Sequence, residues 1–139
     1  MKVVIVGCGK VGKTIAEELV KENHDIILID ENAELVEDVS NSLDVIGVIG
    51  NGASLNILKE AGIETADVLI AVTSADEINM LCCLFAKKAN KDLKTIARVR
   101  NPIYSSELSY IKDELGLTMT INPEMITARE ISRLIRWPS

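Results

Sequence analysis

Aromatic side chains are scarce in this sequence of 139 residues, at 3% of the composition. Proteins that bind single-stranded nucleic acid stack bases on aromatic rings, and proteins that follow a phosphate backbone carry basic clusters. Basic residues are also in the minority here, since 15 of them face 21 acidic residues and the formal net charge is −6. The composition therefore argues against a nucleic-acid partner and predicts an aliphatic core.

Cysteines and long apolar runs are equally limited. The three cysteines cannot pair evenly, and Cys82 is adjacent to Cys83, so we expect reduced thiols, as in a cytoplasmic protein. The first apolar run, Val3 to Val6, ends at Gly7, which argues against a signal peptide. No stretch approaches the roughly 20 apolar residues that span a bilayer. We therefore predict a soluble chain that does not insert into a membrane.

Hydrophobic residues make up 47% of the chain and charged residues 26%, as in an ordinary globular protein. We predict one domain over residues 1–139. Short β-branched runs, typical of strands, fall at 2–6, 25–29, 44–49, 67–72, 95–99 and 117–121. Amphipathic helical runs fall between and after them, at 11–22, 32–42, 54–61, 76–90, 103–115 and from Asn122, with Pro123 and Glu124 in the first turn, to the chain end. This alternation predicts an α/β fold: a Rossmann-type, doubly wound parallel six-stranded sheet of order 3-2-1-4-5-6 with helices on both faces.

A glycine-rich turn joins the first predicted strand to the first helix. Its sequence is Gly7-Cys8-Gly9-Lys10-Val11-Gly12, which matches G-x-G-x-x-G in the strand-to-helix context that gives this motif meaning. The first glycine permits the tight turn, the second lets a pyrophosphate approach the backbone, and the third lets helix and strand pack closely. The pattern predicts a dinucleotide site.

The same residues also fit the Walker A pattern, because Lys13 and Thr14 complete G-x-x-x-x-G-K-[ST]. Two features favour the dinucleotide over a P-loop NTPase. Asp30 ends the second strand, where a carboxylate binds an adenosine ribose. The apolar helical stripe already starts at Val11, which leaves a short loop for a triphosphate. Asp30 and the neighbouring Glu31 would also repel the 2′-phosphate of NADP.

Other candidate ligand contacts follow the later strands, because ligands of open parallel sheets bind beyond the strands' carboxyl ends. Asn51 lies in the loop after strand three, where we expect the adenine. Thr73 and Ser74 follow strand four and either reach a phosphate or ribose or cap the next helix. Arg98 and Arg100 share one face of strand five and either neutralise a phosphate or pair with surface acids.

Catalytic groups are missing from this predicted crevice. The single histidine, His24, precedes strand two and belongs to the opposite, amino edge of the sheet. Neither Tyr104 nor Tyr110 has a lysine four residues later, as one class of reductases requires. No second domain is available to exclude water from a nicotinamide. We therefore expect a nucleotide sensor and not an enzyme, with an NAD-dependent oxidoreductase fragment as the alternative and a P-loop NTPase as a weaker one.

Five separated motifs resemble the N-terminal domain of TrkA-type proteins, the KTN/RCK regulatory domains of Trk and Ktr potassium uptake systems. The motifs are Val3 to Gly12, Leu28 to Asp30, Gly50 to Ala53, Ala66 to Thr73 with Asp76, Glu77 and Asn79, and Ile96 to Pro102. The resemblance implies a cytoplasmic, non-catalytic subunit at the inner face of the membrane that gates an integral-membrane potassium-translocating subunit. It also implies binding of NAD(H), with ATP or ADP in some relatives, and assembly into homo-dimers or higher rings.

By position, the ligand contacts of that family fall on Gly7, Cys8, Gly9, Lys10, Val11, Gly12, Asp30, Asn51, Thr73, Ser74 and Arg98. Asn51 stands where the family usually has Asp, and Lys10 replaces a common Arg, so a point charge replaces a bidentate clamp. Family members usually continue into a C-terminal domain, so the chain looks like an N-terminal portion. Its last helix, 122–136, is a candidate interface for self-association, because Met125, Ile126 and other apolar residues cover a wide arc and Trp137 follows them.

Overall fold

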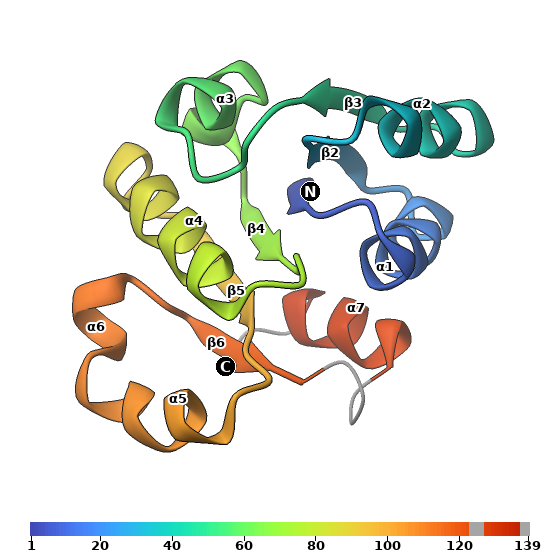
Figure 1. The fold of residues 1–139 in the computed structure, drawn as a ribbon. Helices are drawn as coiled ribbons and strands as arrows, with labels where there is room; N and C mark the ends of the chain where they lie inside the picture. The colour runs from blue at the N-terminus through green and yellow to red at the C-terminus, as the bar shows by residue number, and fades with distance from the viewer. Residues whose placement is uncertain (123–126, 137–139) are drawn as a thin grey trace.

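The computed structural model describes residues 1–122 and 127–136 and places one parallel sheet between two layers of helices (Figure 1). The strands are β1 (Lys2–Val6), β2 (Asp25–Asp30), β3 (Ile46–Ile49), β4 (Val68–Ala71), β5 (Lys94–Arg98) and β6 (Met119–Ile121). They pair in the order β3-β2-β1-β4-β5-β6, and every pairing is parallel. The predicted fold class and strand order are therefore confirmed.

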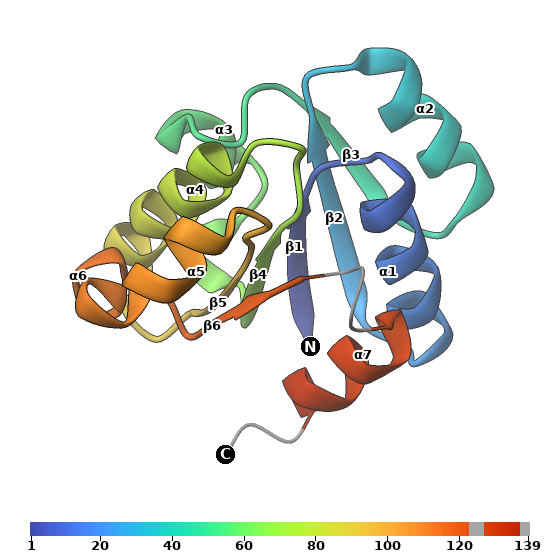
Figure 2. The same ribbon diagram turned by 60° about the horizontal axis from the view of Figure 1, so that its bottom comes forward.

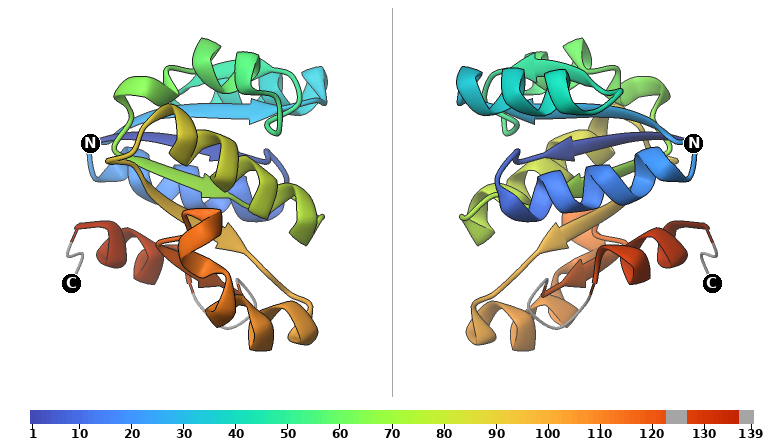
Figure 3. Two further views of the ribbon diagram at one scale, coloured as in Figure 1. Left: turned by 90° about the vertical axis from the view of Figure 1, so that its left-hand side faces the viewer. Right: turned by 90° about the vertical axis from the view of Figure 1, so that its right-hand side faces the viewer.

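The helices divide between the two faces of the sheet, as Figures 2 and 3 show. One face carries α1 (Lys10–Lys21), α2 (Ala33–Ser42) and α7 (Ala128–Arg136). The other carries α3 (Leu55–Glu60), the short 3₁₀ turn η1 (Ile63–Thr65), α4 (Asp76–Ala89), α5 (Pro102–Glu107), the 3₁₀ turn η2 (Leu108–Tyr110) and α6 (Lys112–Leu115). This covering explains why the inner strands are apolar on both sides.

Alternate residues of each inner strand enter two separate cores. Along β1, Val4 and Val6 pack with α3 and α4, whereas Val3 and Ile5 pack with α1, α2 and α7. All four are at most 2% exposed. Burial of this kind stabilises each large aliphatic side chain by about 1.5–3 kcal/mol. The sheet is thereby held rigidly, with the carboxyl ends of the strands along one edge.

The helix predicted over 103–115 is wrong in detail, because the segment breaks into α5, η2 and α6. Leu108 is the one residue of α5 and η2 that is buried, so no continuous apolar stripe holds a single helix against the sheet. The hydroxyls of Ser105 and Ser106 donate to the carbonyls of Asn101 and Ile103, a competition with helical bonding that favours short turns. Ile111, at φ −127°, leaves the helical region between η2 and α6.

The described part of the last helix is shorter than the predicted range 122–136. The Pro123-Glu124 start and the apolar Met125 and Ile126 lie outside the described residues, as does Trp137. Within the described residues, α7 begins at Ala128, and the Thr127 hydroxyl accepts a hydrogen bond from the amide of Glu130 (3.2 Å). Thr127 therefore acts as the cap of the described helix.

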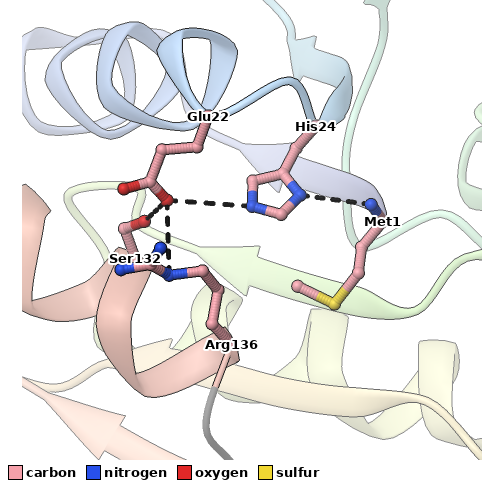
Figure 4. A network of polar contacts seen from close by, with 5 residues as sticks. All are labelled: Met1, Glu22, His24, Ser132 and Arg136. Carbon is pink, nitrogen blue, oxygen red and sulfur yellow. Dashed lines mark hydrogen bonds and ion pairs between the residues drawn. The ribbon is translucent and has the colours of Figure 1, made fainter.

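A polar network fastens α7 to the end of α1 at the amino edge of the sheet (Figure 4). The Glu22 carboxylate accepts a hydrogen bond from the Ser132 hydroxyl and lies 3.6 Å from Arg136 Nε. His24 Nε2 lies 3.9 Å from the same carboxylate, and the Met1 amine lies 3.1 Å from His24 Nδ1. His24 is therefore at the amino edge, as expected from the sequence. Among the described helices, none has the length and apolarity that crossing a bilayer demands.

Candidate functional site

A cavity of about 710 Å³ opens along the carboxyl edge of the sheet. It extends from the loop after β3, across the ends of β2 and β1, to the ends of β4 and β5. Its lining residues are Val6, Gly7, Gly9, Lys10, Val11, Ile29, Asp30, Glu31, Leu35, Gly50, Asn51, Gly52, Val72, Thr73, Ser74, Ala75, Ile78 and Arg98. The strand order reverses at β1, and this switch point is where open α/β sheets bind their ligands.

The glycine turn between β1 and α1 forms the floor of this cavity. Gly7 has φ +112°, a conformation that side chains disfavour. A Cβ on Gly12 would lie 1.7 Å from the Gly7 carbonyl oxygen, so only glycine lets α1 pack this closely. A Cβ on Gly9 would meet nothing within 4 Å, which leaves its cavity side open. Gly9 also caps α1 without a side-chain hydrogen bond, so the amides of the first turn remain free for an anion.

Asp30 lies beside this turn at the end of β2. Its carboxylate accepts hydrogen bonds from the amides of Cys8 (2.7 Å) and Asn32 (2.9 Å). The first of these bonds ties the glycine turn to β2. A carboxylate has about four acceptor positions, so two backbone bonds leave capacity for ribose hydroxyls. Glu31 also lines the cavity, and its charge adds to the negative field at this point.

The loop after β3 supplies the cavity wall beyond Asp30. Asn51 Oδ1 accepts a hydrogen bond from the amide of Ala53 (2.8 Å), which closes the loop on itself. Leu35 from α2 and Ile78 from α4 add apolar surface to the cavity. Neither residue was expected from the sequence, although each is an apolar residue in the first turn of a helix that follows a strand end.

Thr73, Ser74 and Arg98 line the opposite end of the cavity, after β4 and at the end of β5. The guanidinium Nη1 of Arg98 lies 3.5 Å from the Val72 carbonyl and 3.4 Å from that of Thr73. Arg98 Nε is buried and has no hydrogen-bond partner in the described structure. Arg100 is exposed, and its amide donates to the Asp76 carboxylate. The strand ends at Arg98, so the two arginines do not share the cavity.

Two predicted contacts, Cys8 and Gly12, support the turn without lining the cavity. The Cys8 side chain is 2% exposed and packs in the core with α1. Burial, with a smaller contribution from the Asp30 charge, raises the pKa of Cys8 to about 12. The thiol is therefore protonated at neutral pH and is not a nucleophile there. Among the described residues, no group of three or more His, Cys, Asp or Glu side chains could hold a metal ion.

The residues that would complete a Walker A motif lie outside the cavity. Lys13 and Thr14 are exposed and do not line the cavity. The Thr14 hydroxyl donates to the Lys10 carbonyl (2.7 Å), one turn back in α1. Because α1 already begins at Lys10, the loop after β1 contains three residues only, Gly7 to Gly9. This geometry supports the dinucleotide interpretation of the turn over the P-loop interpretation.

The sheet order and the cavity at its switch point define a Rossmann-type domain with a candidate nucleotide cleft. The chain belongs to the TrkA-N domain family, whose sequence model matches residues 3–123. It is 41% identical over 138 residues to the Trk system potassium uptake protein TrkA homolog of Archaeoglobus fulgidus, covering 99% of this chain and 31% of that protein. It is 38% identical over 139 residues to the Trk system potassium uptake protein TrkA of Halomonas elongata, covering 99% and 30%. The chain thus spans about a third of the length of these relatives, and the family resemblance seen in the sequence is confirmed.

Solved structures share the same fold. The TrkA-N domain of the inner membrane protein ybaL from Escherichia coli has a TM-score of 0.77 at 27% identity, covering 97% of this chain and 93% of that one. The GsuK channel bound to NAD has a TM-score of 0.73 at 19% identity, covering 86% of this chain and 21% of that one. At that identity the second likeness concerns the fold alone.

Proposed function

We propose that this chain is the nucleotide-binding regulatory domain of a potassium uptake system and that its cleft binds NAD(H). The observation that carries the proposal is the cavity at the switch point, where the open Gly9 backbone and the Asp30 carboxylate lie side by side. Helix amides for a pyrophosphate and a carboxylate for a ribose are the two elements of a dinucleotide site. Curated relatives named as Trk potassium uptake proteins support the regulatory role.

The order of groups along the cavity assigns a part of the ligand to each. The pyrophosphate would lie on Gly7, Gly9, Lys10 and Val11, with Cys8 and Gly12 shaping the turn beneath it. The adenosine ribose would bind Asp30, and the base would extend over the loop of Asn51. The second half of the ligand would then reach Thr73, Ser74 and Arg98. The Asp30 and Glu31 charges disfavour the 2′-phosphate of NADP, while ATP or ADP fits the same adenosine and phosphate positions.

A regulatory role without catalysis accords with the chemistry at the cleft. In the described structure the cavity lining contains no histidine, cysteine or tyrosine. The titratable side chains of the lining are Lys10, Asp30, Glu31 and Arg98, and Asp30 is engaged with two backbone amides. We propose that the domain forms homo-dimers or higher rings at the cytoplasmic face of the membrane. There it would gate an integral-membrane potassium-translocating subunit according to the nucleotide bound.

Calorimetric titration of the purified chain with NAD+, NADH, ATP, ADP and NADPH tests the cofactor assignment. We expect binding of NAD(H) or of the adenine nucleotides, and weaker binding of NADPH than of NADH. The absence of binding for all of them would overturn the proposed function. Steady hydrolysis of ATP, or oxidation of NADH by the purified chain, would favour an enzyme instead.

A further inference from the structure

One buried side chain, that of Asn79 in the first turns of α4, joins the ends of β4 and β5 beneath the cavity. It is 0% exposed and does not line the cavity itself. Its Oδ1 atom accepts hydrogen bonds from the Thr73 amide (2.8 Å) and the Thr73 hydroxyl (2.7 Å). Its Nδ2 atom donates to the carbonyls of Thr73 (3.1 Å) and Arg98 (3.0 Å). An Asn amide can form about four hydrogen bonds, and all of them here hold two cavity-lining residues.

The two residues that Asn79 holds also depend on each other. The Arg98 guanidinium lies against the Val72 and Thr73 carbonyls, with Nη1 distances of 3.5 and 3.4 Å. The Thr73 hydroxyl is oriented further by the backbone of Ala75, whose amide lies 3.3 Å away. The Asn79 amide therefore holds the Thr73 hydroxyl directly. It holds Arg98 through the backbone, at the Arg98 carbonyl and at the Thr73 carbonyl that the guanidinium contacts. We expect a change in the amide to loosen the support of both Thr73 and Arg98.

The other end of the cavity is built without Asn79. The glycine turn is tied to β2 through Asp30 and Cys8, and the Asn51 loop closes on Ala53. In the described structure the four hydrogen bonds of the Asn79 amide go to Thr73 and Arg98 and do not reach these residues. An AMP moiety would contact only this end, whereas the groups beyond its phosphate would continue toward Thr73 and Arg98. The cavity thus has two halves with separate supports.

We propose that Asn79 is the positioning residue for the half of the cleft that receives whatever extends beyond the AMP moiety, and that it leaves the AMP half unaffected. This inference rests on the proposed nucleotide-binding function. For NADH the extension is the second nucleotide, and for ATP it is the outer phosphates. Asn79 itself touches no ligand in this scheme.

The test compares short and long ligands on the variant Asn79→Ser, titrated with AMP, NADH and ATP. We expect the affinity for the long ligand, NADH or ATP, to fall by about tenfold, which corresponds to about 1.4 kcal/mol. The AMP affinity should change by less than about threefold, since the AMP half keeps its own hydrogen bonds. A general loss of structure would weaken both ligands together, so the ratio of the two affinities separates positioning from folding.

A matched control exists at the other end of α4. Asn90 Nδ2 donates to the carbonyls of Ile63 (3.1 Å) and Ala66 (2.9 Å), far along the helix from the cavity. Asn90→Ser removes a comparable amide and should lower thermal stability while leaving both affinities unchanged. If Asn79→Ser does not fold, Asn79→Asp keeps acceptor oxygens for Thr73 and removes the donor group. Its ratio of affinities should shift in the same direction.

Three outcomes overturn the inference. One is an equal loss of affinity for AMP and for the long ligand in the Asn79 variants. Another is an unchanged affinity for the long ligand. The third is a wild-type chain that binds none of the ligands, which overturns the proposed function and this inference with it. If the wild-type chain binds the ligands, and the ratio of the long-ligand affinity to the AMP affinity changes in the Asn79 variants but not in Asn90→Ser, both the proposed function and this inference are supported.

Discussion

At the scale of single residues, Asp30 combines a structural and a binding role. Because its carboxylate already accepts the Cys8 and Asn32 amides, Asp30→Ala would remove both the proposed ribose contact and an anchor of the glycine turn. We expect NADH binding to weaken by about 1.5–3 kcal/mol, the range for hydrogen bonds to a charged group. Titration calorimetry measures the change.

Asp67 provides the control for that variant. Its carboxylate accepts the Lys2 amide (2.8 Å), also in a backbone contact, but at the amino edge of the sheet. Asp67→Ala should leave the NADH affinity unchanged. An unaltered NADH affinity in Asp30→Ala would contradict the assignment of Asp30 to the ribose. Equal losses of NADH affinity in Asp30→Ala and Asp67→Ala would show that the loss comes from reduced stability.

Two lysines of α1 separate the dinucleotide and P-loop interpretations. Lys10 lines the cavity, whereas Lys13 is exposed outside it. We expect Lys13→Ala to leave nucleotide affinity nearly intact and Lys10→Ala to weaken it, because only Lys10 can place its charge near a phosphate. Parallel titrations of both variants provide the comparison. Loss of binding on Lys13→Ala, or magnesium-dependent hydrolysis that needs Thr14, would restore the P-loop interpretation.

Much of the candidate site could be predicted from the sequence, because glycine spacing and strand-end positions are local signals. Asp30 and the glycine turn belong to this class, and the structure brings them together. The direction of a side chain depends on tertiary packing, which local sequence patterns do not reveal. The sequence therefore did not predict that Cys8 faces the core or that Arg100 lies outside the cavity. For the same reason it did not predict that Leu35 and Ile78 line the cavity.

At the scale of elements, the strands and the helices α1 to α4 could be predicted because each carries a clear periodic pattern. The segment from α5 to α6 could not, since its single buried residue before α6, Leu108, gives no periodicity. The predicted start of the last helix, at Asn122-Pro123, reaches outside the described residues. Within them, α7 is capped at Thr127 and positioned by its contacts with α1.

The contact between α7 and α1 predicts a pH dependence of stability. Burial lowers the pKa of His24 below its ordinary value of 6.5, and the positive Met1 amine adds to this effect, while Glu22 opposes it. Arg136 and Asp25 contribute smaller effects of opposite sign. Because the unfolded chain binds the proton more readily, the His24 contribution is complete above its ordinary pKa of about 6.5 and is lost as the pH falls from there through the lowered pKa of the folded state.

Thermal unfolding at about pH 7.5 and about pH 5.5 measures this dependence. We expect the wild-type melting temperature to fall more on acidification than that of His24→Gln, which cannot titrate at this position. Carboxylates titrate in both proteins, so the difference between them isolates the histidine. Equal slopes for the two proteins would contradict the assignment.

At the scale of the whole molecule, part of the apolar surface on which the proposed self-association depends is buried within the chain. Ile131 and Ile135 are 1% and 3% exposed, because they pack within the chain against the α1 face of the sheet. Part of the wide apolar arc of the last helix is therefore used by the chain itself. On the described part of α7, Leu134 is the large apolar side chain that stays exposed, at 37%. Deleting the helix would also uncover the α1 face, so a point substitution is the sharper test.

We predict that the chain self-associates through the outer side of α7 and that Leu134→Asp weakens this association, because a charge would be buried there without a partner. Leu81 on α4 is equally exposed, at 37%, and Leu81→Asp is the matched control. Sedimentation velocity at about 50 μM, a concentration at which weak dimers with μM affinity are populated, compares the three proteins. Dissociation caused by Leu134→Asp alone supports an interface at α7. Dissociation caused by Leu81→Asp alone would move the interface to α4, and monomers in all three would show that this chain does not associate by itself.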